Sequence, residues 1–262
     1  MVEVSNLTKR YGKKTAIENI SFTVKPGHIY GFLGPNGAGK STTMNIMTGY
    51  LAPTSGTVTV NGYDIFKDAV KAKKEIGYLP EMPPVYMDMT VQEYLRFVAE
   101  LKGIPKKQRS DEIIDVLERT QTADVCDKLI RNLSKGYRQR VGLAQALIGN
   151  PEVIILDEPT VGLDPKQIAE VRDLIRSLKE NHAVILSSHI LSEISEVCDQ
   201  VFIISQGKLV LGDSLQHIEA TGESLEEVFL SMTEDTYAKE SDIDEDADME
   251  DTEEEKVDDS DL

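Results

Sequence analysis

The sequence predicts an α/β fold whose alternating strands and helices are interrupted by a helical insertion. Near residues 29–49, a short apolar strand runs into a glycine-rich turn and then a helix, which is the local order of a phosphate-binding loop. Residues 83–149 show helical periodicity without strand signals, and short apolar strands return after residue 152. These observations favour one α/β core with a helical insertion.

The first part of the chain carries β-rich segments separated by turns. Pro26-Gly27 and Gly56 mark the turns, because proline and glycine suit the backbone angles found there. The expected elements are the strands Ile17–Val24, Ile29–Leu33 and Thr57–Asn61, and the helix Gly39–Gly49.

The middle of the chain is expected to be helical and the last part to return to α/β order. Apolar residues in Met89–Gly103 and Ser110–Thr120 recur at helical spacing. A further helix, Tyr137–Ile148, follows Ser134, which is a favoured N-cap residue. The later elements are the strands Val153–Leu156, Ala183–Ser187 and Val201–Ser205, and the helices Pro165–Glu180 and Ile190–Cys198.

The net charge of −18 is concentrated at one end of the sequence. Glu234–Leu262 holds sixteen acidic residues and two lysines, a balance of −14, which leaves −4 for Met1–Thr233. A segment so charged and so poor in apolar side chains cannot offset the entropy of ordering. We expect a folded domain over residues 1–233 and a disordered acidic tail over 234–262.

Neither a disulfide framework nor a membrane span is expected. Cys126 and Cys198 lie far apart and outside any metal-ligand spacing, so structural thiols are the simplest interpretation. The first residues carry no basic flank and apolar run typical of a secretory signal, and no apolar stretch approaches eighteen residues. A membrane function would therefore need a separate partner and would be exerted from the cytosol.

The segment GPNGAGKST at Gly34–Thr42 matches the phosphate-loop pattern. Its backbone N–H groups would cradle phosphates, Lys40 would reach the β- and γ-phosphates, Ser41 would ligate Mg²⁺ and Thr42 would bind the α-phosphate. The alternative is a glycine turn with an exposed lysine. The expected nucleotide-binding residues of this loop are Gly34, Asn36, Gly37, Gly39, Lys40, Ser41 and Thr42.

Two adjacent carboxylates end the apolar strand Val153–Leu156. Asp157 is placed to hold Mg²⁺ directly or through water, as such a carboxylate does in nucleotide hydrolases. Glu158 should point elsewhere, because successive strand residues alternate in direction. Seen alone, the pair could equally be a solvated turn.

The order of the phosphate loop, the turn Ser134-Lys135-Gly136 before a helix, and the strand ending in Asp157-Glu158 resembles the ATP-binding cassette (ABC) ATPases over about Val2–Thr233. This resemblance implies a P-loop NTPase core with an antiparallel β subdomain and a helical insertion, using ATP and Mg²⁺. It also implies that Glu158 activates the attacking water, that His189 touches the γ-phosphate, and that Tyr11, just before the first strands, stacks on adenine.

In that family, the turn matched by Ser134 and Gly136 binds the nucleotide held by another subunit. One phosphate loop and one such turn imply that a complete site needs two chains head to tail, either two copies or this chain with a homologous ATPase subunit. Asp164 would lie at their interface. Arg138 and Arg140 are more consistent with a helix surface or interface, and no nucleic acid is expected.

Two positions depart from the commonest family pattern. Lys135 and Tyr137 replace the usual glycine and glutamine of Ser-Gly-Gly-Gln, and Glu81 replaces a glutamine. Glu81 could still ligate or water-bridge Mg²⁺. These variants, and the ending Ser224–Phe229, resemble exporters whose transmembrane permease subunits are separate polypeptides.

The expected function is therefore an ATP-hydrolysing subunit, peripheral on the cytoplasmic face of the cell membrane, whose dimer closure powers a permease. The alternative is a soluble ATPase switch of the same family, such as an iron–sulfur assembly factor. A polytopic membrane protein encoded beside it would favour export.

Overall fold

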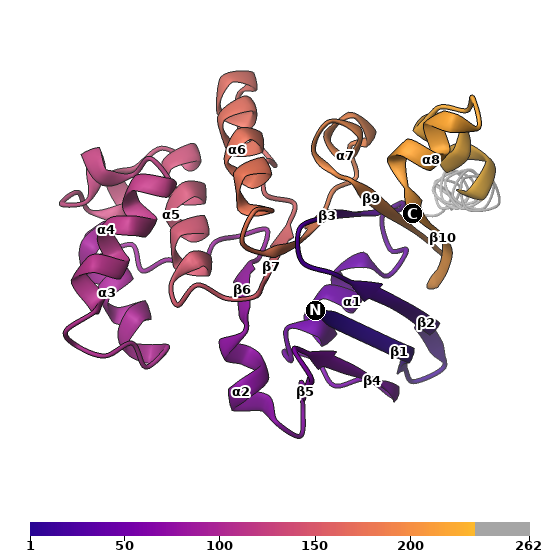
Figure 1. Ribbon diagram of the computed structural model, residues 1–262, viewed down its shortest axis with the longest axis horizontal. Helices are drawn as coiled ribbons and strands as arrows, with labels where there is room; N and C mark the ends of the chain where they lie inside the picture. Colours follow the sequence, from indigo (N-terminus) through magenta and orange to yellow (C-terminus); the bar gives the residue numbers. More distant parts are fainter. Residues whose placement is uncertain (234–262) are drawn as a thin grey trace, which may run out of the picture.

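The computed structural model describes residues 1–233, so the expected acidic tail, 234–262, lies outside the described residues. Two sheets and a set of helices build the fold (Figure 1). The helices α3, α4 and α5 lie on one side of the molecule, away from β1, β2 and β4 (Figure 1). This arrangement confirms the predicted α/β fold with an antiparallel β subdomain and a helical region.

The smaller sheet is antiparallel and has the order β2-β1-β4-β5. Strand β1 was not predicted; in it, buried Val2, Val4 and Leu7 are separated by exposed residues. Tyr11 ends β1 and pairs with Lys14, so it belongs to the first strand rather than preceding it. The strands are β1 (Val2–Tyr11), β2 (Lys14–Val24), β4 (Ser55–Val60) and β5 (Tyr63–Asp64).

The larger sheet has the order β10-β9-β3-β8-β7-β6 and is parallel except for β10. Its central strands are buried along their whole length and are mostly apolar, because both faces are covered. In β7, Ile154 and Leu156 face one core while Val153 and Ile155 face the other. The strands are β3 (Ile29–Leu33), β6 (Ile76–Leu79), β7 (Val153–Asp157), β8 (Ala183–Ser187), β9 (Gln200–Ser205) and β10 (Lys208–Ser214).

Helix α1 (Lys40–Met47) packs in the core shared by the two sheets, where Met44, Ile46 and Met47 are fully buried. The opposite face of the larger sheet is covered by helices of the middle and last parts of the chain. The helices of these two parts are α3 (Val91–Leu101), α4 (Arg109–Arg119), α5 (Lys135–Leu147), α6 (Pro165–Leu178), α7 (Leu191–Val197) and α8 (Leu215–Ala220). The remaining helix, α2 (Ala69–Lys74), directly precedes β6.

Local sequence explains where the helices of the middle part begin and end. Thr90 and Glu93 form a reciprocal capping box at the start of α3. Lys102, just past the end of α3, donates to the carbonyl oxygens of Ala146 and Ile148 and so satisfies the end of α5. Two short 3₁₀ turns, η1 (Ala123–Val125) and η2 (Ile130–Asn132), connect α4 to α5.

Within residues 1–233, no helix is both long enough and apolar enough to cross a membrane. Both cysteines are free thiols, Cys198 being buried and Cys126 partly buried.

Candidate nucleotide-binding site

The glycine-rich loop joins the end of β3 to the start of α1. Gly39 is the N-cap of α1 with a φ of 112°, and a Cβ there would lie 2.6 Å from Cγ2 of Ile17 and 2.9 Å from the carbonyl oxygen of Ala16. Only glycine combines this backbone angle with such close packing. No side chain caps the first N–H groups of α1, so they remain available to an anion.

Lys40 directs its ammonium group back over this loop. Its Nζ donates to the carbonyl oxygens of Gly34, at 2.6 Å, and Pro35, at 3.1 Å, while the residue is 8% exposed. Burial lowers the pKa of Lys40, and the nearby carboxylates of Glu158 and Asp157 act in the opposite direction. The result is a poorly hydrated cation placed where an anionic ligand would compensate it.

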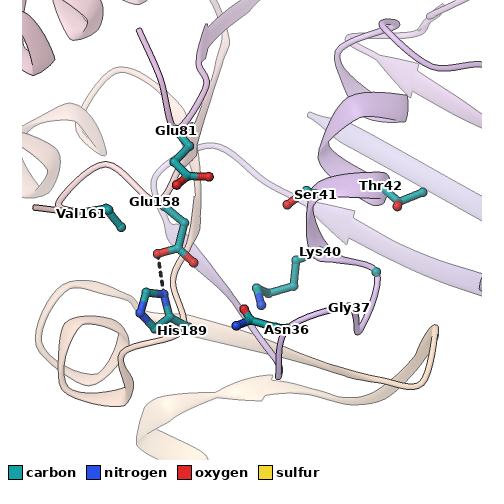
Figure 2. A pocket seen from close by; sticks show the side chains of 10 residues that line it. Asn36, Gly37, Lys40, Ser41, Thr42, Glu81, Glu158, Val161 and His189 are labelled. Carbon is teal, nitrogen blue, oxygen red and sulfur yellow. Dashed lines mark hydrogen bonds and ion pairs between the residues drawn. The ribbon is translucent and has the colours of Figure 1, made fainter. Parts of the chain in front are cut away.

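A cavity of about 370 Å³ opens beside this loop. Lys40, Ser41 and Thr42 line one side, and Glu81, Glu158 and His189 face them across it (Figure 2). The structure thus brings together side chains from the loop after β3, the segment after β6 and the ends of β7 and β8. The lining residues are Asn36, Gly37, Gly39, Lys40, Ser41, Thr42, Glu81, Glu158, Val161 and His189; of these, Val161 was not anticipated.

Glu158 and His189 both line the cavity, and their side chains are in polar contact. His189 Nδ1 lies 2.9 Å from Glu158 Oε2, shown by the dashed line in Figure 2. Burial raises the pKa of Glu158, and the hydrogen bond from His189 partly offsets that rise. A carboxylate with a raised pKa is a better proton acceptor.

Asp157 occupies a different position from its neighbour. It is the last residue of β7, is 8% exposed, and accepts a 2.5 Å hydrogen bond from Oγ of Ser187 on β8. Asp157 is not among the lining residues, whereas Glu158 is. Glu158 lies beyond the end of β7 and has a φ of 49°, so the turn after the strand, and not strand alternation, sets its direction.

The oxygen donors around the cavity fit a hard divalent cation. Ser41 and Glu81 line it, and Asp157 is near enough to the lining residue Lys40 to raise the pKa of its ammonium group. Hydroxyl and carboxylate oxygens are the ligands that Mg²⁺ prefers. Among residues 1–233, no group of three His, Cys, Asp or Glu side chains forms a ready metal site. Such a cation would therefore also need oxygens from a bound phosphate, as is usual for Mg²⁺.

The turn before α5, which contains Ser134 and Gly136, does not line this cavity. Ser134 caps α5 by accepting a hydrogen bond from Tyr137 N, and Gly136 packs so closely on Gln167 that a Cβ would lie 2.7 Å from its side-chain carbon. Asp164 caps α6 and accepts from Gln167 N at 2.9 Å. Gly136 and Asp164 line a separate cavity of about 250 Å³.

Tyr11 is not brought to the cavity either. Its side chain is 49% exposed, and Nζ of Lys9 lies 5.2 Å from its ring centroid. Gly34 opens the loop but does not line the cavity, and a Cβ there would collide with the carbonyl oxygen of Ile204. Most of the predicted residues therefore belong to a cavity set or to a set at the starts of α5 and α6, while Gly34, Asp157 and Tyr11 belong to neither.

A family model for ABC transporters matches residues 17–161, so the fold and motifs define an ABC transporter ATPase and the chain belongs to this family. It is an ATP-binding subunit that hydrolyses ATP to power transport. It is 41% identical over 221 residues to the bacitracin transport ATP-binding protein BcrA of Bacillus licheniformis, covering 84% of this chain and 71% of BcrA. It is 35% identical over 230 residues to the lantibiotic transport ATP-binding protein SrtF of Streptococcus pyogenes, covering 87% and 96%.

Solved structures agree with this assignment. An ATP-binding subunit of an ABC transporter superimposes with a TM-score of 0.80 at 28% identity, covering 88% of this chain and 99% of that one. CbiO1 of Clostridium perfringens, part of the transporter complex cbiONQ, superimposes with a TM-score of 0.76 at 30% identity, covering 85% and 91%. The dimeric bacterial cassette MJ0796, at 24% identity, a TM-score of 0.73 and coverage of 82% and 98%, shares the fold.

Proposed function

We propose that this subunit binds Mg-ATP in a head-to-tail dimer and powers export of antibiotic-like molecules through a separate membrane permease, from the cytoplasmic face. One observation supports the dimer: the two parts of the expected ATP site, which we call half-sites, lie apart in one chain. The cavity with Lys40 and Glu158 lacks Ser134 and Gly136, which lie at the start of α5 beside Asp164. A second copy, or a homologous ATPase subunit, would complete the site.

In this proposal, each cavity residue has a chemical role. Lys40 compensates the charge of the β- and γ-phosphates, and the N–H groups at the start of α1 and the hydroxyl of Thr42 bind phosphate oxygens. Ser41, Asp157 and Glu81 would hold Mg²⁺, and the cation would supply positive charge near the phosphates. The donor set of the cavity supports this assignment.

Glu158 is the proposed general base. Its carboxylate accepts a proton from the attacking water, and burial favours this by raising its pKa. His189 orients the carboxylate through the 2.9 Å contact of its Nδ1. When both ring nitrogens carry a proton, Nε2 can also donate a hydrogen bond to the γ-phosphate. Tyr11 at its exposed hairpin is the proposed stacking partner of adenine, an assignment that rests on the family alone.

The names of similar proteins support antibiotic-like molecules as the transported substrate. BcrA and SrtF carry bacitracin and lantibiotic transport in their names, and a Bacillus subtilis protein 37% identical to this chain over 211 residues is a linearmycin resistance ATP-binding protein. All three names concern antibiotics. Export of such molecules, rather than iron–sulfur assembly, is accordingly the function we favour.

Co-expression with the membrane protein encoded beside it, in an antibiotic-sensitive bacterium, tests this proposal. We expect a higher minimal inhibitory concentration for bacitracin or a lantibiotic, and loss of the gain with Lys40→Ala. Exposed Glu118→Ala on α4 is the control and should keep the gain. Unchanged sensitivity to both classes, with a functional ATPase retained in the membrane fraction, would refute the cargo. A wholly cytosolic protein without a membrane partner would favour the soluble alternative.

A further inference from the structure

One buried carboxylate has no part in the chemistry described above. Glu193 lies in the first turn of α7, four residues after His189, and is only 3% exposed. Burying a carboxylate costs free energy unless its oxygens are hydrogen-bonded. The partners of Glu193 therefore indicate what it does.

Those partners come from the two loops that carry the proposed catalytic pair. Oγ1 of Thr160 lies 2.7 Å from both carboxylate oxygens of Glu193, and Oγ of Ser188 donates to Oε2 at 2.8 Å. Thr160 follows Glu158 by two residues, and Ser188 directly precedes His189. One side chain thus bridges the loop after β7 and the loop after β8.

These loops need support from outside their strands. The ladder between β7 and β8 ends at Asp157 and Ser187, and beyond it the backbone N–H of Glu158 donates to Ser187 O at 3.2 Å and to Ser187 Oγ at 3.1 Å. Glu158 also has a φ of 49°, which is uncommon for a residue with a side chain and persists when the surroundings hold it. The hydroxyls bound by Glu193 belong to Thr160, two residues after Glu158, and to Ser188, directly before His189, and their hydrogen bonds supply that hold.

The same carboxylate is linked to α6, the helix capped by Asp164. Arg172 of α6 lies 3.9 Å from Oε1 of Glu193 and also pairs with Glu196 at 2.5 Å. The two hydroxyls, at 2.7 and 2.8 Å, are closer to Glu193 than Arg172 is, and Arg172 lies nearer to Glu196. The geometry of Glu193 therefore favours a role in aligning the two loops over a simple ion pair.

We propose that Glu193 is a positioning residue for ATP hydrolysis, which sets the separation of Glu158 and His189 by holding Thr160 and Ser188. It acts through these loops and does not contact the nucleotide. This inference rests on the proposed role of Glu158 as the base.

Substitutions at Glu193 in the full-length protein separate positioning from binding. Glu193→Ala should lower kcat about 10- to 100-fold, as misplacement of a catalytic group by about an ångström does. Glu193→Gln keeps one acceptor oxygen and the side-chain shape, so its kcat should be intermediate. The dissociation constant for ATP, measured in a Glu158→Gln background that removes turnover, should stay nearly unchanged. Glu196→Gln on the same helix is the matched control and should keep the parental rate.

A second pair of variants covers the case in which Glu193→Ala does not fold. Thr160→Val matches the shape of threonine but lacks the hydroxyl, whereas Thr160→Ser keeps it. If the hydroxyl–carboxylate contact positions the base, the serine variant should retain more kcat than the valine variant. If packing alone matters, valine should do as well or better, which would overturn the proposal.

Two further results would also overturn it. One is a kcat for Glu193→Ala equal to that of Glu196→Gln. The other is a parallel loss of ATP affinity and melting temperature that accounts for the whole loss of rate. If Glu158→Gln itself keeps normal turnover, the proposed base is wrong instead, so the two failures are distinguishable.

Discussion

The Nδ1 atom of His189 lies 2.9 Å from Oε2 of Glu158, although the residues are 31 positions apart. They meet because β7 and β8 are parallel neighbours whose carboxyl ends lie at the same edge of the sheet. The contact orients a carboxylate that burial makes more basic.

Replacing Glu158 should separate hydrolysis from ATP binding. Glu158→Gln should keep nucleotide affinity and lose about 10²–10⁴-fold in turnover, because the amide cannot accept the proton of water. Lys40→Ala should weaken binding itself, because its ammonium is the buried cation of the cavity. Steady-state hydrolysis and nucleotide titration of both variants are the measurements. Turnover of Glu158→Gln near the parental rate would remove this residue from the chemistry.

ATP should join two chains across the separated half-sites. Asn36→Cys in one chain and Lys135→Cys in another should cross-link when ATP is added to a Glu158→Gln background. The native thiols Cys126 and Cys198 must first be replaced, because both are free. Non-reducing gels report the covalent dimer, and omission of ATP is the control. Cross-links that form only within a chain carrying both cysteines would contradict the head-to-tail arrangement.

Glu81 should matter more for coupling than for ATP binding. It lines both the nucleotide cavity and a second cavity of about 720 Å³, bounded by Pro83, Met87 and Arg138. We expect this second cavity to receive the membrane partner, so Glu81→Ala should reduce transport per ATP hydrolysed, since coupling is a free energy between two sites. Transport and ATPase assays on the same reconstituted complex measure it. Exposed Glu118→Ala is the control, and an unchanged ratio in Glu81→Ala would contradict the assignment.

His182 should make stability depend on pH. Its ring is fully buried, contacts Arg119 at 3.0 Å and pairs with the Pro151 carbonyl oxygen at 2.7 Å. Burial is the main cause of its lowered pKa; Arg119 lowers it further, while Pro151 and Glu152 oppose the shift. The unfolded chain therefore binds the proton more readily, and the free energy of unfolding should fall as pH drops below the ordinary value of 6.5.

Thermal denaturation between neutral pH and about pH 5, below the ordinary histidine pKa, measures this effect. His182→Gln should flatten the dependence of melting temperature on pH, whatever its melting temperature at neutral pH. Exposed His217→Gln is the control and should leave the slope in place. An identical slope in His182→Gln and the parent would show that other groups dominate.

Features built from contiguous residues were predictable from the amino-acid sequence. The phosphate loop needs only Gly34–Thr42 and the helix after it, and the pair Asp157-Glu158 needs only a strand that ends there. Apolar strands such as β7 and β8 were predictable because burial on both faces leaves an uninterrupted apolar run. The edge strand β10 was missed because its residues are only partly buried, and β6 because it has four residues, one of them Gly77.

Contacts between distant residues depend on the tertiary structure. The order of β3, β8 and β7 brings His189 to Glu158 and faces both toward Lys40. It also places Glu193 against Thr160, a contact for which neither segment carries a sequence signal. Nothing in the sequence spacing specifies strand order, because long-range packing of the two cores selects it. That packing keeps the half-site at Ser134 apart from the phosphate loop within one chain.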